Sequence, residues 1–302
     1  MKKIIFFILC LSQVGTSWSQ VGSSGKASIL INNKPQPDVK QGVTLKPEPA
    51  KPVQTIIKTE ILPELTTEGG RYYALVMGIN NYNDPLINKL DNPIKDADIF
   101  YNTITSRYTF EKDNVKLLHN ASIADIVEAL DYFVKVIRPV DNFLIFYAGH
   151  GVWDASSEIG FWLPSDASKD SKLAWFRNST LRDYLREIKS KHTLLISDAC
   201  FGGSIFKSRS AFIDASTAVN KLYELPSRKA MTSGTLTEVP DQSAFLKYLI
   251  DRLVKNTEKY LPSEQLFSSF RIAVINNSNV VPQFGEIRDV GDEGGDFIFI
   301  LK

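Results

Sequence analysis

The sequence predicts an α/β fold, with a mostly parallel central sheet that is covered by helices on both faces. Three nearly continuous apolar runs, at residues 72–79, 142–148 and 193–197, support this prediction. Short runs of this kind, without polar alternation, are typical of strands that are buried on both faces. Segments with helical periodicity lie between the runs, and strands that alternate with helices indicate a parallel sheet.

The predicted elements follow one another from residue 71 onward. The first strand leads to a helix at residues 96–105 and a short strand at 115–119. Ser122 can cap the next helix, which ends at residue 137. The remaining elements are a helix at 181–189 before the third apolar strand, a strand near 229–233, helices at 244–255 and 263–275, and a last strand at 297–301.

The first 19 residues have the pattern of a signal peptide. Lys2 and Lys3 precede an apolar run at residues 4–11, and Ser17-Trp18-Ser19 forms a small-x-small cleavage site. The apolar run is too short to span a bilayer, which needs about 20 residues. Leu9 is too large for the usual lipid-attachment pattern before Cys10. We therefore expect export to the periplasm or the extracellular space, without stable membrane insertion.

Residues 20–70 differ in composition from the rest of the chain. This segment holds six of the fourteen prolines and no aromatic residue. It has little apolar surface to bury, so we expect a Pro-rich linker or a removable pro-segment. The folded domain is then expected at residues 71–302.

Composition also limits the partners and the redox chemistry. The formal net charge is +1, which gives no support to a nucleic-acid or anionic-lipid partner. Removal of the signal peptide removes Cys10 and leaves Cys200 alone, so an internal disulfide is excluded. Cys200 is then either a buried inert thiol or a reactive one.

Unusual residues follow two of the buried strands. Gly149-His150-Gly151 follows residues 142–148, and Asp198-Ala199-Cys200-Phe201-Gly202-Gly203 follows residues 193–197. Ligands of parallel sheets bind beyond the carboxyl ends of the strands, so neighbouring strands would bring His150 and Cys200 to one edge. An imidazole that takes the thiol proton raises its reactivity, and the backbone amides of Gly151 and Cys200 can stabilise an oxyanion.

These residues resemble a known signature. Asp198-Ala199-Cys200-Phe201-Gly202, with His150 fifty positions upstream, is similar to the caspase pattern. The stretches YALVMGINNY, LDNPIKDA, PQFG and GDEGGDFIF also resemble the clan of caspases, metacaspases, paracaspases, legumains and gingipains. The resemblance covers residues 71–302. It implies a caspase-like three-layer sandwich with a large part to about residue 206, a loop at 207–228 and a small part at 229–302.

The resemblance also implies an activity and a specificity. The activity would be that of a cysteine endopeptidase, with a His150–Cys200 dyad and a thioester acyl-enzyme. Caspases have glutamine where this chain has Asp198, whereas metacaspases and paracaspases have an acid there and accept Arg or Lys. Asp96 matches their second pocket acid, and Glu238 is a weaker third candidate. Carboxylates facing one pocket would bind a guanidinium, so the expected partners are proteins or peptides with basic residues.

Simpler readings remain for several of these residues. Asp96 and Asp198 could instead cap a helix or a turn. His119 and His192 have no matching partner in the sequence, so we expect them to be structural or exposed.

A metal or cofactor is not expected. Four acidic residues suggest a calcium-binding site, but their spacing does not match an EF-hand loop. A solvated loop is the simpler interpretation. The scattered histidines offer no zinc set. These acids are Asp154, Glu158, Asp166 and Asp170.

Two other functions stay open. The chain could be a non-catalytic caspase-like scaffold or binding module, or a hydrolase or transpeptidase of the same clan that acts on another acyl group. The loop at residues 207–228 suggests self-cleavage, although an uncut tether fits it nearly as well. Its basic residues are Lys207, Arg209, Lys221 and Arg228. The sequence does not define the oligomeric state.

Overall fold

The structure is a computed structural model that describes residue 65 and residues 69–199, 205–209, 219–234 and 243–302. The predicted signal peptide and nearly all of the Pro-rich segment lie outside these described residues, as do Cys200 and Glu238. All described residues belong to one unit of the chain, Ile61–Lys302.

A seven-stranded sheet runs through this unit. Its strand order is β2-β1-β3-β7-β9-β11-β8. The first five strands in that order are parallel, and β11 runs antiparallel to both β9 and β8. The strands are β1 (Tyr72–Gly78), β2 (Phe110–His119), β3 (Asn142–Ala148), β7 (His192–Asp198), β8 (Phe206–Arg209), β9 (Ser227–Thr232) and β11 (Gln283–Ile287).

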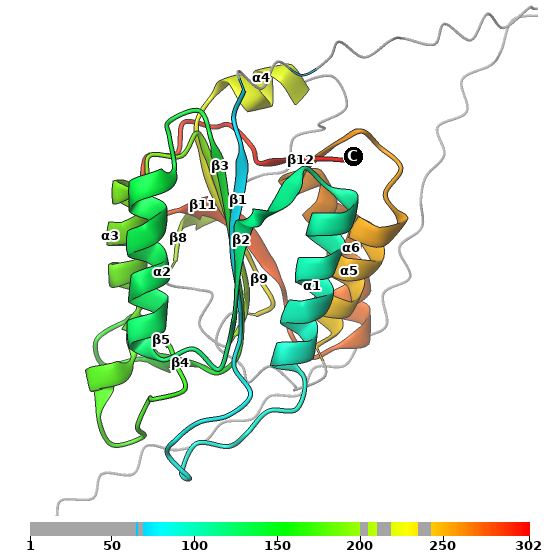
Figure 1. Cartoon of the computed structure of the whole chain (residues 1–302). Helices are drawn as coiled ribbons and strands as arrows, with labels where there is room; N and C mark the ends of the chain where they lie inside the picture. The colour runs from blue at the N-terminus through cyan, green and yellow to red at the C-terminus, as the bar shows by residue number, and fades with distance from the viewer. Residues whose placement is uncertain (1–64, 66–68, 200–204, 210–218, 235–242) are drawn as a thin grey trace, which may run out of the picture. The chain divides into compact units, whose positions relative to one another are not determined.

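Helices cover both faces of the sheet, as Figure 1 shows. The face on the right of the view carries α1 (Pro93–Arg107), α5 (Ala244–Lys255) and α6 (Ser263–Asn277). The opposite face carries α2 (Ile123–Val136) and α3 (Asn178–Glu187). The short helix α4 (Val219–Glu224) lies at the end of the sheet where the parallel strands begin.

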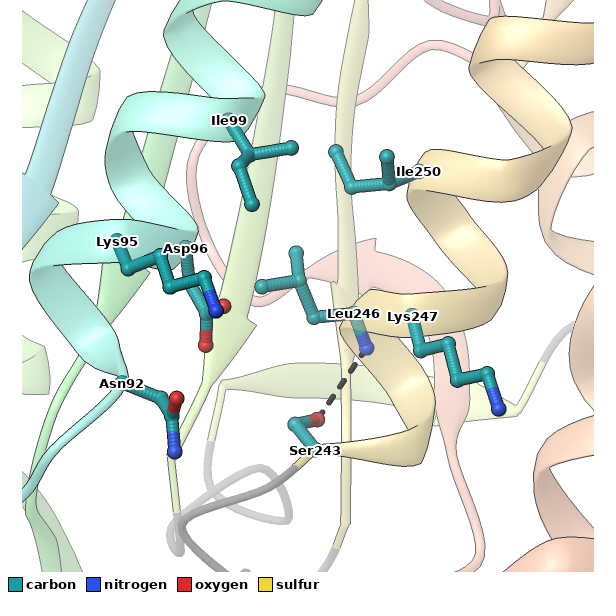
Figure 2. A pocket seen from close by; sticks show the side chains of 8 residues that line it. All are labelled: Asn92, Lys95, Asp96, Ile99, Ser243, Leu246, Lys247 and Ile250. Carbon is teal, nitrogen blue, oxygen red and sulfur yellow. Dashed lines mark hydrogen bonds between the residues drawn. The ribbon is translucent and has the colours of Figure 1, made fainter.

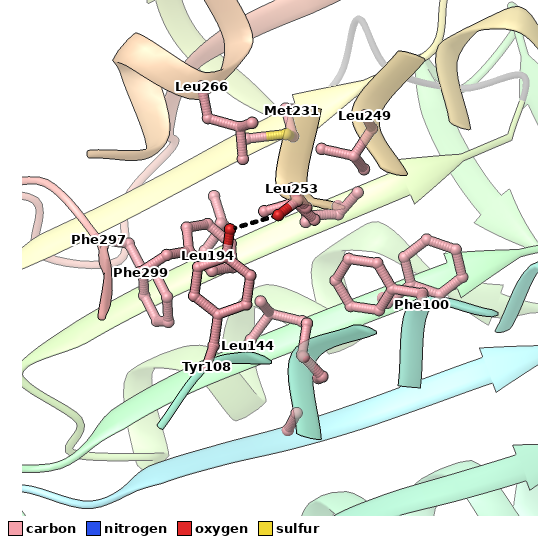
Figure 3. Close-up of a cluster of buried hydrophobic side chains, with 14 of the residues drawn as sticks. Phe100, Tyr108, Leu144, Leu194, Met231, Leu249, Leu253, Leu266, Phe297 and Phe299 are labelled. Atoms are coloured by element: carbon pink, nitrogen blue, oxygen red, sulfur yellow. Dashed lines mark hydrogen bonds between the residues drawn. The ribbon is translucent and has the colours of Figure 1, made fainter. Parts of the chain in front are cut away.

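Each face of the sheet packs its own core, because successive side chains of a strand point to opposite faces. On the α1/α5/α6 face, Phe100 stacks on Phe146 with ring centroids 4.4 Å apart. The Tyr108 hydroxyl donates to the Leu253 carbonyl oxygen over 2.8 Å, a contact that Figure 3 draws inside this cluster. These packed layers fix the strand ends that carry the candidate functional residues.

Two small sheets flank the central one. One contains β4 (Gly151–Asp154), β5 (Ile159–Trp162) and β6 (Phe176–Arg177), and a 3-10 turn at Lys172–Ala174 lies just before β6. The other pairs β10 (Tyr260–Pro262) with β12 (Ile298–Ile300). No helix among the described residues is long and apolar enough to cross a membrane.

The predicted fold class is confirmed, and the long elements lie where the periodicity placed them. Ser122 caps α2 with a full capping box, in which the side chains of Ser122 and Asp125 bond each other's backbone. Helix α1 begins three residues earlier than expected, at Pro93, because proline is well tolerated in the first turn. The last strand pairs with β10 and not with the central sheet.

Candidate active site

The two strands that precede the predicted dyad residues pair with each other in the sheet. In their register, Ala148 of β3 is the partner of Asp198 of β7. His150 and Cys200 each follow this pair by two residues in the sequence. Because β3 and β7 are parallel, both strands end at the same edge of the sheet. His150 is described and half-buried there, whereas Cys200 lies outside the described residues.

Backbone contacts anchor His150 on both sides. Its N–H donates to the Tyr82 hydroxyl over 2.9 Å. Its carbonyl oxygen accepts from the Tyr147 hydroxyl at 2.7 Å and from the Leu163 N–H at 3.0 Å. The Tyr82 ring also lies against the imidazole, with centroids 5.1 Å apart. The position of the imidazole is therefore set by buried neighbours.

The imidazole has a defined tautomer. Nε2 lies 2.8 Å from the carbonyl oxygen of Asn88, which can only accept a hydrogen bond. Nε2 therefore carries the proton, and in the neutral ring Nδ1 keeps its lone pair. A ring held in this way can take a proton at Nδ1.

The loop that provides the Asn88 carbonyl is itself fixed. Between β1 and α1, the Asn80 side chain accepts from the Ile94 N–H at 2.7 Å and donates to the Asp91 carbonyl at 3.1 Å. Asn120 accepts from the Asn80 N–H at 2.9 Å. Side-chain amides thus bond the loop to the start of α1 and to the end of β2.

Asp198 is the last residue of β7 and is 7% exposed. Burial raises the pKa of its carboxyl group, while the hydroxyls of Ser233 and Ser243 act in the opposite direction. By bond geometry, however, Asp198 Oδ1 and Ser233 Oγ lack a hydrogen-bond partner within the part of the chain that the structure describes. A buried carboxylate oxygen of this kind favours a ligand that donates hydrogen bonds.

Asp96 lies in the first turn of α1 and lines a groove between α1 and α5. The groove has a volume of about 290 Å³, and Figure 2 shows Ile99 and Ile250 facing each other across it. Ser243 also lines this groove, and its hydroxyl caps α5 by accepting from the Leu246 N–H at 3.2 Å. Ser243 therefore adjoins both predicted pocket acids, which lie on the same face of the sheet.

Basic side chains border the same groove. Lys95 and Lys247 line it together with Asn92, Asp96 and the apolar residues. The Asp96 carboxylate thus shares the groove with two ammonium groups, which oppose its negative charge.

The other predicted residues have these positions. Gly151 is the first residue of β4, directly after His150. His119 Nε2 lies 2.8 Å from Asp98 Oδ1 on the surface. His192 is fully buried, and its ring nitrogens contact Ser227 Oγ at 2.9 Å and the Tyr223 carbonyl oxygen at 3.0 Å. Burial lowers the pKa of His192 to about 3, so it is a neutral structural residue.

The four acids that invited a calcium reading are dispersed. Asp154 accepts hydrogen bonds from Ser156 and Ser157 and pairs with Lys172, and these contacts lower its pKa, with Lys172 the largest cause. Asp166 accepts from the Ile123 N–H at 2.9 Å. Among the described residues, no three His, Cys, Asp or Glu side chains are grouped so that they could hold a metal ion.

The four basic residues proposed for self-cleavage all lie in regular elements. Lys207 and Arg209 are in β8, which pairs with β11, and Lys221 is in α4. Arg228 is in β9, and its guanidinium donates to backbone carbonyls of Ser190, Lys191 and Ser227. A cut at any of them would first require the element to open.

Several residues of the site had no signal in the sequence. Tyr82 and the Asn88 carbonyl orient His150 from a loop that is remote in sequence. Ser233 and Ser243 contact Asp198 although they follow it by 35 and 45 positions. The side chain of Tyr82 is part of the quoted stretch YALVMGINNY, but no pattern indicates its contact with His150.

Comparisons with known proteins identify the family of this chain. Residues 71–284 match the Caspase domain family. Metacaspase-1 of Saccharomyces cerevisiae is 29% identical over 111 residues, which are 34% of this chain and 25% of that protein. Metacaspase-1 of Kluyveromyces lactis is 30% identical over 90 residues, which are 27% of this chain and 20% of that protein. The matches thus span about a quarter or less of these relatives. A solved structure of a Geobacter sulfurreducens protein aligns with a TM-score of 0.49 at 18% identity, covering 76% of this chain and 93% of that one.

Proposed function

This chain belongs to the caspase domain family, a family of cysteine peptidases, and on that premise we propose that it is an exported endopeptidase that cleaves after arginine or lysine. Metacaspase relatives support the same class. The observation that carries the proposal is the register match of Ala148 with Asp198, because the two proposed dyad residues each follow it by two positions.

In the proposed reaction, His150 Nδ1 takes the proton of the Cys200 thiol. The sulfur attacks the peptide carbonyl carbon, and the backbone amides of Gly151 and Cys200 would stabilise the oxyanion. The imidazolium then gives its proton to the leaving amine, and a thioester remains. A water that loses its proton to His150 hydrolyses the thioester, and the thiol is regenerated as the acid product leaves.

The Asn88 carbonyl has a role in each of these steps. It accepts from Nε2–H and so keeps Nδ1 as the atom that exchanges the proton. When the ring becomes charged, the same carbonyl dipole stabilises the imidazolium. A backbone carbonyl thus orients the His150 imidazole here, whereas a carboxylate orients the catalytic histidine in other hydrolases.

The proposed preference for arginine or lysine depends on Asp198 and Asp96. The unpartnered Oδ1 of Asp198 would accept a hydrogen bond from a guanidinium or an ammonium group. Apolar side chains of the adjoining groove, Ile99 and Leu246, would contact the methylene stem of such a residue. Glu238, which lies outside the described residues, is proposed as a weaker third acid.

Peptides that differ only in the residue before the cut test this function. We would compare Arg, Lys, Gln and Asp at that position, using the full chain and its Cys200→Ala variant. We expect Arg and Lys to exceed Gln by about 10²-fold or more in kcat/KM, because a neutral amide leaves the buried acids unpaired. Preference for Asp would refute the specificity, and equal cleavage by Cys200→Ala would refute the mechanism. No cleavage of any peptide would favour the scaffold alternative, and joined products would favour a transpeptidase.

Export is tested separately. The protein produced with its first 19 residues in a secreting host should be recovered outside the cytoplasm with Gln20 as its first residue. Recovery of the intact N-terminus in the cytoplasm would contradict export without affecting the proposed chemistry.

A further inference from the structure

A second polar cavity, of about 370 Å³, lies beside β4, the strand that begins directly after His150. The residues that line it are Trp153, Glu158, Ile159, Gly160, Asn178, Ser179, Arg182, Phe206 and Arg288.

Two walls of this cavity come from segments that follow the proposed dyad residues in the sequence. Trp153 is on β4, which begins one residue after His150. Phe206 begins β8, six positions after Cys200 in the sequence, and the Arg288 N–H donates to the Ile205 carbonyl at 2.9 Å. The first turn of α3 closes the cavity, and it starts at the edge of the sheet where β3 ends.

The charge of the cavity is predominantly positive. Arg182 and Arg288 both line it, and neither guanidinium forms an ion pair with a carboxylate among the described residues. The start of α3 adds the positive end of a helix dipole. Glu158 is the one acid that lines the cavity, and it is exposed on the β4–β5 turn, where water screens it. A guanidinium matches the geometry of a carboxylate, so two arginines in one cavity favour an acidic group.

The cavity and the groove at Asp96 lie on opposite sides of the sheet. The Asp96 groove is on the α1/α5 face, whereas α3 and Phe206 pack with the core of the other face (Figure 1). The end of β3, with His150, lies between them. A peptide that puts its basic side chain near Asp96 and Asp198, and its scissile bond at the dyad, would continue past His150 toward α3. On this proposed path the cavity would lie on the leaving-group side.

From this arrangement we propose that the cavity binds an acidic side chain of the substrate, located after the cleaved bond and held by Arg182 and Arg288. The inference rests on the proposed peptidase function. Trp153 is three residues beyond His150 along β4, which corresponds to about 10 Å. An extended substrate covers that length in about three residues, so the acid belongs at the second to fourth position after the cut.

The test uses quenched fluorescent peptides with arginine before the cut and either Glu or Gln at one of these positions. We expect the full chain to prefer the Glu peptide by about 10-fold in kcat/KM, because a charge-assisted bond to the half-buried Arg182 allows it, while water screens the exposed Arg288 more strongly. An Arg182→Gln, Arg288→Gln double variant should lose this preference, and added salt should weaken it. Glu158→Gln should increase it, because that change removes the opposing charge.

Arg186→Gln is the matched control. Arg186 lies one turn further along α3, pairs with Asp183, and does not line the cavity. This variant should keep the preference for Glu, and a thermal melt of each variant shows whether it folds. A preference that persists in the double variant, or equal rates for the two peptides with the full chain, would overturn the inference.

A failure of the proposed peptidase function would give different results from a failure of the cavity proposal. Hydrolysis without discrimination between Glu and Gln would remove only the cavity proposal. If no peptide is cleaved, the peptidase function fails, and the equilibrium affinities of the two peptides for the Cys200→Ala chain still decide whether the cavity selects an acid. Equal affinities there would overturn the cavity proposal as well.

Discussion

Gly149, between β3 and His150, offers a sharp test of how the histidine is positioned. Its φ is +157°, a region that L side chains rarely adopt. A Cβ atom added there would lie 2.8 Å from the Tyr147 hydroxyl oxygen. That tyrosine cannot easily move, because it is fully buried and stacks on Trp162 with ring centroids 4.4 Å apart. The same hydroxyl is the one that bonds the His150 carbonyl oxygen.

The cost of Gly149→Ala has two parts. Backbone strain at such a φ is on the order of 1–3 kcal/mol. Displacement of the Tyr147 hydroxyl from the His150 carbonyl adds roughly 1 kcal/mol. A total of about 2–4 kcal/mol leaves most domains of ordinary stability folded. A shift of His150 by about 1 Å would nonetheless lower the rate of catalysis by about 10²-fold.

Gly291→Ala is the matched control for this change. Gly291 has a φ of +84°, and a Cβ there meets nothing within 4 Å. Both variants should lose thermal stability, but only Gly149→Ala should lose about 10²-fold in kcat/KM for an arginyl peptide. If the two variants lose stability alike and both keep full activity, the reasoning about Tyr147 and His150 is wrong.

Four further outcomes are expected. Tyr82→Phe removes the acceptor of the His150 N–H and keeps the ring, so kcat should fall about 10-fold with little change in KM; an unchanged kcat would contradict this role. Gly78→Ala would put a Cβ 2.5 Å from the Pro93 carbonyl oxygen and displace the start of α1, so KM for basic peptides should rise, and an unchanged KM would show that α1 can adapt. Burial raises the pKa of Asp198, so a cationic inhibitor should bind more tightly as the pH rises through that pKa. An inhibitor affinity that does not change with pH in the acid range would argue against contact between Asp198 and the cation. The NMR signals of His192 should remain those of a neutral ring at pH 5, because its pKa of about 3 lies below that of an unfolded histidine, about 6.5. The contribution of the neutral ring to the stability of the fold is therefore lost as the pH falls below about 6.5. Titration of the His192 signals near pH 6 would disprove its burial.

The parts of the fold that could be predicted are those with strong local patterns. Strands β1, β3 and β7 are continuous apolar runs, and the Ser122 capping box marks the start of α2. The family match and the sheet topology confirm the predicted caspase-like fold. Strands β8 and β11 were not predicted, because they are short and mix polar with apolar residues.

The candidate site was predictable where side chains carry the chemistry. His150 could be selected from its place after a buried strand, and Asp198 and Asp96 from the resemblance to metacaspases and paracaspases. The role of the Asn88 carbonyl could not be predicted, because every residue has a backbone carbonyl and the residue type does not indicate its contact. Arg182 and Arg288 could not be paired either, since they are 106 positions apart and only the tertiary fold brings them to one cavity.

The central claim is that Cys200 is a nucleophile activated by His150, and covalent labelling tests it most directly. The full chain would be incubated with an arginyl peptide that carries an electrophile, and the adduct would be located by mass spectrometry of its fragments, which separates Cys200 from Cys10. We expect one adduct on Cys200, none in Cys200→Ala, and labelling slowed by about 10²-fold or more in His150→Ala, since a general base contributes that much. Labelling that is unaffected by Cys200→Ala, or a Cys200 that reacts at the same rate without His150, would contradict the claim.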